Sequence, residues 1–310
     1  MSKITKIKIG SRTSKLALSQ VAEFHLILAQ HFPQIKIEIV PITTSGDKIQ
    51  DRNLADIGGK GLFIKELEEA LLQGKIDIAI HSAKDVPPQI HEKTLLAALT
   101  ERMDARDCFV SKKYKSLKDL PKGAIIGTSS PRRKAILLNI RSDLKIVNFR
   151  GNVDTRLNKV ENEEVDGAIL AVCGLVRIAK DNIIKEIISK EKILPAGGQG
   201  SLAIQALKEN KEILEVLKKV NHLETQIAIK CERTFLKELG ASCTTPVAAH
   251  AQKIKDKLVL ETAIIDYDGK EIYTTKSKTN INLEDAIELG KKAAEKTKKQ
   301  AKKLLEKIRQ

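Results

Sequence analysis

Arginine side chains follow several of the strands that the sequence predicts, and they could bind a ligand with more than one negative charge. A guanidinium group binds a carboxylate or a phosphate through two parallel hydrogen bonds. In open α/β sheets, ligands bind beyond the carboxyl ends of the strands. The arginines at or just after such strand ends are Arg12, Arg132, Arg133, Arg150, Arg156 and Arg177. We therefore expect a cleft for a ligand that carries several carboxylates or phosphates.

The segment 127–134, "GTSSPRRK", ends a predicted strand and opens a predicted helix. Ser130 is a favourable N-cap residue, and Pro131 suits the first helical position. The helix amides, Thr128, Ser129 and the arginine pair would then converge on one anion in a solvent-facing cleft. The alternative is a capped helix whose arginines are solvated.

The segment 81–88, "HSAKDVPP", places Ser82, Lys84 and Asp85 at the end of the third predicted strand, beside the same cleft. A carboxylate among cations has a lowered pKa. Asp85 would therefore be ionised and able to pair with positive charge that develops during a reaction. The alternative is an aspartate turn beside a surface lysine.

Cys243 is the one cysteine that lies in a predicted loop of small residues, "GASCTTP". Cys108, Cys173 and Cys231 are expected to be packing residues. The four cysteines form no C-x-x-C pair, so the sequence predicts neither a disulfide framework nor a zinc site, and it favours a reducing compartment. From composition alone, the simpler interpretation of Cys243 is a buried thiol in a turn.

The segment 45–63, "SGDKIQDRNLADIGGKGLF", contains Asp47, is polar and then rich in glycine, and places Lys60 between two glycines. It lacks the G-x-x-x-x-G-K-[ST] spacing of a phosphate-binding loop, so a nucleoside triphosphate site is not predicted. We expect a mobile lid over the cleft.

The elements that must position these residues follow an alternating pattern. Strands and helices alternate up to residue 82, and the pattern restarts after the polar connection "ERMDARD". This order predicts mostly parallel, doubly wound sheets. From residue 222 we expect a helix to Leu239, the cysteine loop leading into a strand, two strands joined at Asp268-Gly269, and one terminal helix. The predicted fold is therefore α/β, with two doubly wound domains and a small C-terminal α+β domain.

The expected domain boundaries follow from the same pattern. Residues 1–100 and 198–219 form the first α/β domain of the cleft, residues 101–197 the second, and residues 220–310 the C-terminal domain with Cys243. Gly197, Gly198 and Gly200 punctuate the chain after the second domain and could form a hinge.

The charge of the chain raises the question of nucleic-acid binding. The formal net charge of the 310 residues is +15, but residues 291–310, with nine Lys and Arg against two Glu, account for nearly half of it. An apolar stripe on this terminal helix makes the lysines its solvated face. With no Trp, three Tyr and six Phe, side chains for base stacking are scarce. The sequence therefore does not favour nucleic-acid binding.

No apolar run approaches the ~18 residues that span a bilayer, and the first residues do not form a signal region. We expect a cytoplasmic protein without membrane contact.

Six short motifs occur in this order along nearly the whole chain: "GGKGLF", "HSAKDVPP", "GTSSPRR", "RGNVDTRL", "PAGGQG" and "ASCTTP". Together they resemble the porphobilinogen deaminase, or hydroxymethylbilane synthase, family. The resemblance implies two periplasmic-binding-protein-like (type II) α/β domains that enclose a cleft, and a third domain that presents a cysteine to it. Two positions depart from the pattern of some members: Ala241-Ser242 replaces paired glycines, and Pro131 replaces a leucine.

The resemblance also implies the roles of individual residues. Cys243 would hold a dipyrromethane cofactor through a thioether, and Asp85 would be the catalytic carboxylate. The expected cofactor-binding residues are Ser82, Lys84, Asp85, Thr128, Ser129, Ser130, Arg132, Arg133 and Arg150. The expected substrate-binding residues are Arg12, Lys60, Arg150, Arg156 and Arg177.

The resemblance implies a transferase that condenses four molecules of porphobilinogen head to tail into hydroxymethylbilane and releases ammonia. Each porphobilinogen brings two carboxylates, which explains the need for many guanidiniums. The expected protein is a monomer that uses no metal. The alternative is a two-domain anion-binding module without catalysis, which would leave the third domain and Cys243 unexplained.

Overall fold

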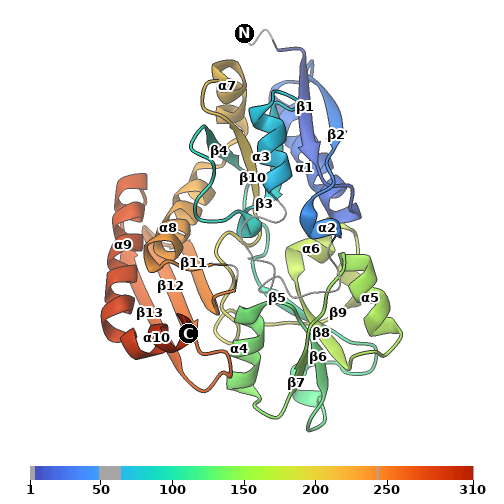
Figure 1. The fold of residues 1–310 in the computed structure, drawn as a ribbon, viewed down its shortest axis with the longest axis vertical. Helices are drawn as coiled ribbons and strands as arrows, with labels where there is room; N and C mark the ends of the chain where they lie inside the picture. The colour runs from blue at the N-terminus through green and yellow to red at the C-terminus, as the bar shows by residue number, and fades with distance from the viewer. Residues whose placement is uncertain (1–3, 49–63, 243, 310) are drawn as a thin grey trace.

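The computed structural model describes residues 4–48, 64–242 and 244–309. Two α/β lobes lie one above the other, and a smaller unit of α8 to α10 and β11 to β13 packs beside them (Figure 1). Each lobe is built on a five-stranded sheet, and the smaller unit is built on a three-stranded sheet. This arrangement confirms the fold class that the sequence predicts.

The first lobe contains a sheet of order β2-β1-β3-β10-β4. Its strands are β1 (Lys6–Ser11), β2 (Lys36–Pro41), β3 (Ile78–Ser82), β4 (Thr94–Leu99) and β10 (Leu202–Leu207). Its helices are α1 (Lys15–His31), α2 (Ser45–Lys48), α3 (Lys65–Leu72) and α7 (Lys211–Val220). β1 pairs in parallel with β2 and β3, whereas β10 runs antiparallel to β3 and β4. Ile7, Ile9, Phe24 and Leu28 are fully buried between the sheet and α1.

The second lobe contains a sheet of order β7-β6-β8-β5-β9. Its strands are β5 (Asp107–Val110), β6 (Ile125–Gly127), β7 (Lys145–Val147), β8 (Gly167–Ala171) and β9 (Ile184–Ile187). Its helices are α4 (Pro131–Ile140), α5 (Val153–Glu161) and α6 (Val172–Arg177). The predicted start of α4 is confirmed. Ser130 Oγ caps α4 by accepting from Arg133 N, and Asn152 caps α5 by accepting from Thr155 N.

The third unit comprises α8 (Leu223–Leu239), β11 (Val247–Ile254), β12 (Lys257–Ile265), β13 (Ile272–Thr279), α9 (Leu283–Gln300) and α10 (Lys302–Arg309). The three strands form an antiparallel meander, and Cys231 and Phe235 of α8 are fully buried against it, as the sequence predicts. The expectation of one terminal helix is wrong, because the helix is interrupted at Ala301. Thr297 Oγ1 donates to Ala293 O in the preceding turn, a bond that bends helices.

Two segments connect the lobes, one between β4 and β5 and one between β9 and β10. Gly198 and Gly200 lie in the second segment, with φ of 82° and 105°. A Cβ on Gly198 would lie 2.8 Å from Lys84 N, so no larger residue fits there without a shift of the backbone. Movement at this segment stays a prediction.

Glu232 of α8 ties both connections to the third unit. Its side chain is fully buried and accepts two hydrogen bonds from Arg102, at 2.8 and 2.9 Å. It also accepts from Gly198 N and Ala251 N, both at 2.7 Å. Within the described ranges, no helix is long and apolar enough to cross a membrane.

Candidate functional site

A cavity of about 670 Å³ lies where the two lobes and the third unit meet. Most of the residues that the sequence singled out are on its wall: Arg12, Ser82, Lys84, Asp85, Ser129, Ser130, Arg132, Arg133, Arg150, Arg156 and Arg177. Thr128 is not on the wall. It is buried behind it, where its Oγ1 accepts from Ser130 N at 3.3 Å.

Two of the expected residues, Cys243 and Lys60, lie outside the described residues, as does the predicted lid from residue 49 to residue 63. Ala241, Ser242 and Thr245, which flank Cys243 in sequence, line the cavity. The cysteine loop therefore borders the cavity on both sides of Cys243.

Asp85 ends the short 3₁₀ helix η2 (Ala83–Asp85), directly after β3. Its side chain is exposed and borders the cavity. The neighbouring Lys84 is half-buried and donates from Nζ to Gln199 Oε1 at 3.1 Å. Burial and the nearby Arg133 guanidinium lower the pKa of Lys84, and the Asp85 carboxylate opposes this effect. Ser82 accepts from Gln20 Nε2 at 2.7 Å.

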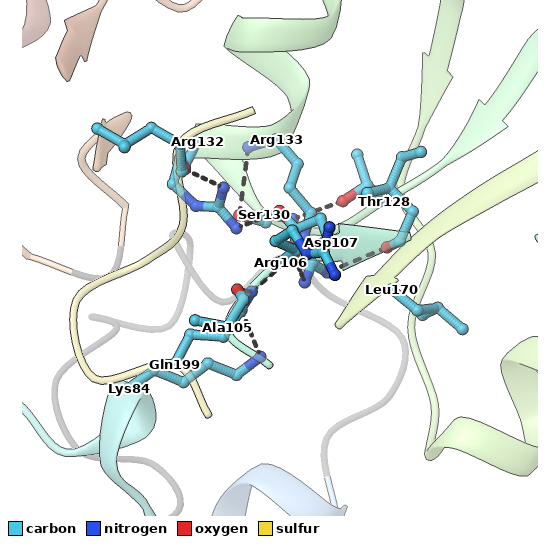
Figure 2. Close-up of polar contacts among 12 residues, drawn as sticks. Lys84, Ala105, Arg106, Asp107, Thr128, Ser130, Arg132, Arg133, Leu170 and Gln199 are labelled. Carbon is cyan, nitrogen blue, oxygen red and sulfur yellow. Dashed lines mark hydrogen bonds and ion pairs between the residues drawn. The ribbon is translucent and has the colours of Figure 1, made fainter. Parts of the chain in front are cut away.

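Figure 2 shows the side chains of Arg132 and Arg133 converging on Asp107, at the start of β5. Arg132 reaches Asp107 Oδ2 at 2.8 Å, and Arg133 reaches Asp107 Oδ1 at 2.7 Å. Burial alone would raise the pKa of Asp107, but the two guanidiniums outweigh it and hold the pKa well below its usual range. Gln199 Nε2 also donates to Asp107 Oδ1, at 2.8 Å.

This cluster corrects an expectation. Arg132 and Arg133 do not face solvent, since only 4% and 6% of their surfaces are exposed, and a buried carboxylate already pairs with both. Asp107 and Gln199 were not recognised in the sequence. Asp107 reads there as part of a polar connection, and no local pattern shows that it meets a helix 25 residues later.

Two further arginines of the wall pair with carboxylates. Arg12 Nε donates to both oxygens of Asp47, at 3.0 and 3.1 Å. Arg177 of α6 donates to Glu23 of α1 at 2.7 and 3.1 Å, and so joins the two lobes. Glu23, too, carried no signal in the sequence.

Three cations of the wall donate to neutral acceptors instead. Lys84 bonds Gln199, Arg156 Nε bonds Gly151 O at 2.9 Å, and Arg233 of α8 bonds backbone carbonyls of residues 86–88. Burial lowers the pKa of Arg156 to about 10, aided by repulsion from Arg133, and burial likewise lowers the pKa of Arg233 to about 10. A cation with a lowered pKa gains from a nearby anion, so this wall suits a ligand with several carboxylates.

Two family models match most of the chain. The family model described as "Porphobilinogen deaminase, dipyromethane cofactor binding domain" matches residues 7–215, and the one described as "Porphobilinogen deaminase, C-terminal domain" matches residues 226–299. The chain belongs to the porphobilinogen deaminase family. The resemblance given by the six motifs is thereby confirmed.

Relatives named porphobilinogen deaminase match most of the chain. The one from Rickettsia canadensis is 47% identical over 290 residues, which are 93% of this chain and 96% of that relative. The one from Alkaliphilus metalliredigens is 46% identical over 266 residues, 86% of this chain and 84% of the relative. Among solved structures, a periplasmic substrate-binding protein of an ABC transporter from Coxiella burnetii is 14% identical, with a TM-score of 0.44, and the match covers 69% of this chain and 91% of that one.

Family membership confirms the predicted function, that of a porphobilinogen deaminase in tetrapyrrole biosynthesis, and with it the transferase class. The chain also contains the family's dipyrromethane cofactor-binding domain. The match at 226–299 covers most of the third unit, which the alternative of a bare anion-binding module left unexplained.

Proposed function

We propose that the cavity is the site where porphobilinogen units are condensed into hydroxymethylbilane, with Asp85 as the catalytic carboxylate and Cys243 as the anchor of the dipyrromethane cofactor. The observation that carries the proposal is the pattern of charge on the wall. Asp85 is an exposed carboxylate at a strand end, and the other described charged residues on the cavity wall are all cations except Asp47, which pairs with Arg12.

The chemistry of these side chains fits the cofactor. Dipyrromethane consists of two porphobilinogen units and so carries four carboxylates. Lys84 and Arg156 are cations that donate to neutral acceptors, and a carboxylate near either of them relieves the cost of burying its charge. Arg150 also lies on this wall. When bound, the cofactor supplies the free pyrrole α-carbon to which the first substrate is joined.

The remaining steps belong to side chains of the chain itself. Asp85 balances the positive charge that develops on a pyrrole nitrogen as ammonia leaves, and it holds the proton that the new bond releases. Lys84 is turned toward Gln199 by its 3.1 Å hydrogen bond, so that Asp85 stays available to the reacting ring. Cations of both lobes hold the acetate and propionate groups and so orient the ring for attack.

The other assigned residues take supporting or binding roles. Ser82, Ser129 and Ser130 border the cavity and offer hydroxyl groups to the cofactor, and Thr128 supports the Ser130 turn from behind. Arg132 and Arg133 bring positive charge to the wall while Asp107 fixes their positions. Arg12, Lys60, Arg150, Arg156 and Arg177 are assigned to substrate carboxylates.

We further propose that residues 1–100 with 198–219, 101–197 and 220–310 are the three domains, and that the chain acts as a cytoplasmic monomer without nucleic acid. The pairing of β10 with β3 and β4 supports the first boundary. The buried free thiols of Cys108, Cys173 and Cys231 suit a reducing compartment.

Intact-mass measurement tests the proposal. The purified protein is expected to exceed its sequence mass by two linked pyrrole units, and peptide mapping is expected to locate them on Cys243. Cys243→Ser is expected to lose the added mass and the activity, because a hydroxyl is a far poorer nucleophile than a thiolate. Cys173→Ser, which alters a thiol that lies on the cavity wall, is the control and is expected to keep the cofactor. An active protein of unmodified mass would contradict the proposal.

A further inference from the structure

Arg233 lies on α8, ten residues before Cys243, yet its guanidinium reaches the loop that follows Asp85. It donates to Val86 O at 2.8 Å, to Pro87 O at 2.7 Å and to Pro88 O at 3.3 Å. Three of its five N–H groups are therefore used on consecutive backbone carbonyls. The helix that leads to the cofactor cysteine thus contacts the loop behind the catalytic carboxylate.

The loop at residues 86–88 makes few backbone hydrogen bonds of its own. Pro87 and Pro88 have no N–H to donate, and Val86 N makes only a long bond to Ala83 O, at 3.4 Å. In this partly buried loop the carbonyls gain from donors, and Arg233 supplies them for three residues in a row. Since Asp85 directly precedes this loop, a shift of the loop moves the carboxylate.

An apolar contact joins the same two segments. Ile229 lies one turn before Arg233 on α8 and is fully buried in a cluster with Ala83 and Val86. Residues four apart on a helix share a face, so Ile229 and Arg233 present one surface to the Asp85 segment. The close approach of Gly198 to the backbone at Lys84 is a further restraint on that segment.

An ion pair does not explain why the Arg233 guanidinium lies against this loop. Among the residues that the structure describes, no carboxylate pairs with Arg233, and its three hydrogen bonds go to neutral carbonyls. The planar guanidinium uses two nitrogens on the loop, whereas a lysine offers its donors from a single nitrogen. The arrangement therefore favours a role in fixing geometry.

We propose that Arg233 is a positioning residue that fixes the position of Asp85 relative to the Cys243 loop. It acts through the carbonyls of residues 86–88 and does not touch the reacting atoms. The inference rests on the proposed roles of Asp85 and Cys243. It adds that the third unit, besides carrying the cofactor, sets where the catalytic carboxylate stands relative to it.

The first test compares Arg233→Met and Arg233→Lys with Lys237→Met, a control that removes an exposed cation from the same helix. Cofactor content is read by intact mass, stability by thermal melting, and catalysis by kcat, KM and the rate of the first pyrrole addition. Arg233→Met is expected to keep the cofactor and to lower kcat and the first addition by about tenfold or more, because small misplacements are costly, while KM stays within about threefold.

Arg233→Lys is expected to recover part of the lost rate, and Lys237→Met to match the unchanged protein. A higher KM at unchanged kcat, or loss of the cofactor, would overturn the proposal in favour of direct carboxylate binding. If Arg233→Met does not fold, Arg233→Lys takes its place as the test variant. A normal kcat in Arg233→Lys would then overturn the proposal.

The second test places Arg233→Met in an Asp85→Glu background, where an extra methylene already displaces the carboxylate. If Arg233 acts through Asp85, its loss lowers kcat much less there than in the unchanged protein. Equal losses in both backgrounds indicate a purely structural role and refute the inference. Asp85→Asn alone separates the catalytic role of Asp85 from the positioning role of Arg233. Normal turnover in Asp85→Asn refutes the catalytic role of Asp85. Lost turnover in Asp85→Asn together with a normal kcat in Arg233→Met refutes only the positioning role.

Discussion

Asp107 shows at the scale of single residues how the wall can carry so much positive charge. One fully buried carboxylate serves two guanidiniums and a glutamine amide, and Arg132 and Arg133 also donate to the carbonyls of Leu194 and Ile169. Buried charges are costly unless they are paired and hydrogen-bonded. The two arginines are therefore part of the structure of the second lobe as well as of the cavity wall.

Replacing Arg133 by Leu is expected to lower the free energy of unfolding by about 3 kcal/mol, because one partner of a buried ion cluster is lost. Denaturant unfolding measures this change. Lys134→Leu, which removes an exposed cation from the next position of α4, is the control and is expected to change stability little. Equal stability of the two variants would contradict the structural role of Arg133.

Asp85→Asn is expected to fold normally and keep the covalent cofactor while turnover falls by about 100-fold or more, since an amide cannot balance charge that develops in the transition state. Steady-state rates together with intact mass check this. Near-normal rates across the pH range would remove Asp85 from its catalytic role.

At the scale of elements, the sequence predicted what short-range patterns encode and missed what distant segments decide. The helices that begin at Pro131 and Leu223 follow capping residues, and both were predicted. β10 was not, because a six-residue apolar run does not reveal that it pairs with two strands more than 100 residues earlier.

The candidate site divides in the same way. Arginines at strand ends and the "HSAKDVPP" segment were recognisable, since a strand followed by polar residues is a local pattern. Glu23, Asp107, Gln199 and Arg233 were not, because each acts through a contact with a different element. A residue's place on a surface helix or in a connecting segment does not indicate which distant residue it contacts.

His81 of β3 gives the first lobe a pH-dependent stability. Its Nε2 lies 2.9 Å from Gln205 Oε1 on β10, and burial lowers its pKa to about 4. Gln205 uses its amide nitrogen on Glu68 and Thr94, so its oxygen accepts from a neutral His81.

The unfolded chain binds this proton near pH 6.5 and the folded chain only near pH 4. The folded state therefore loses stability as the pH falls through that window, by about 3 kcal/mol in total from this group, and regains it as the pH rises. Unfolding free energies measured from pH 7 to pH 4 are expected to fall less steeply in His81→Gln. A slope unchanged by His81→Gln would contradict the assignment.

At the scale of the whole molecule, adjacent residues of α8 connect the parts that must cooperate. Glu232 holds both connections between the lobes, and Arg233 holds the loop behind Asp85. The helix then ends at Gly240, in the left-handed conformation, and leads into the cysteine loop. The third unit is therefore positioned by the same contacts that restrain the lobes.

The Glu232–Arg102 pair allows this coupling to be measured. Glu232→Gln and Arg102→Met are each expected to lower the free energy of unfolding by about 3 kcal/mol, because each leaves a buried partner without its ion pair. In the double variant no buried charge is left unpaired, so the combined loss is expected to be smaller than the sum of the two by about 1 kcal/mol or more.

Glu224→Gln on the same helix breaks only the exposed pair with Lys253, and the expected cost is below about 1 kcal/mol. Denaturant unfolding followed by circular dichroism gives the free energy of unfolding of all four variants. Strictly additive losses would show that α8 does not join the lobes through this pair.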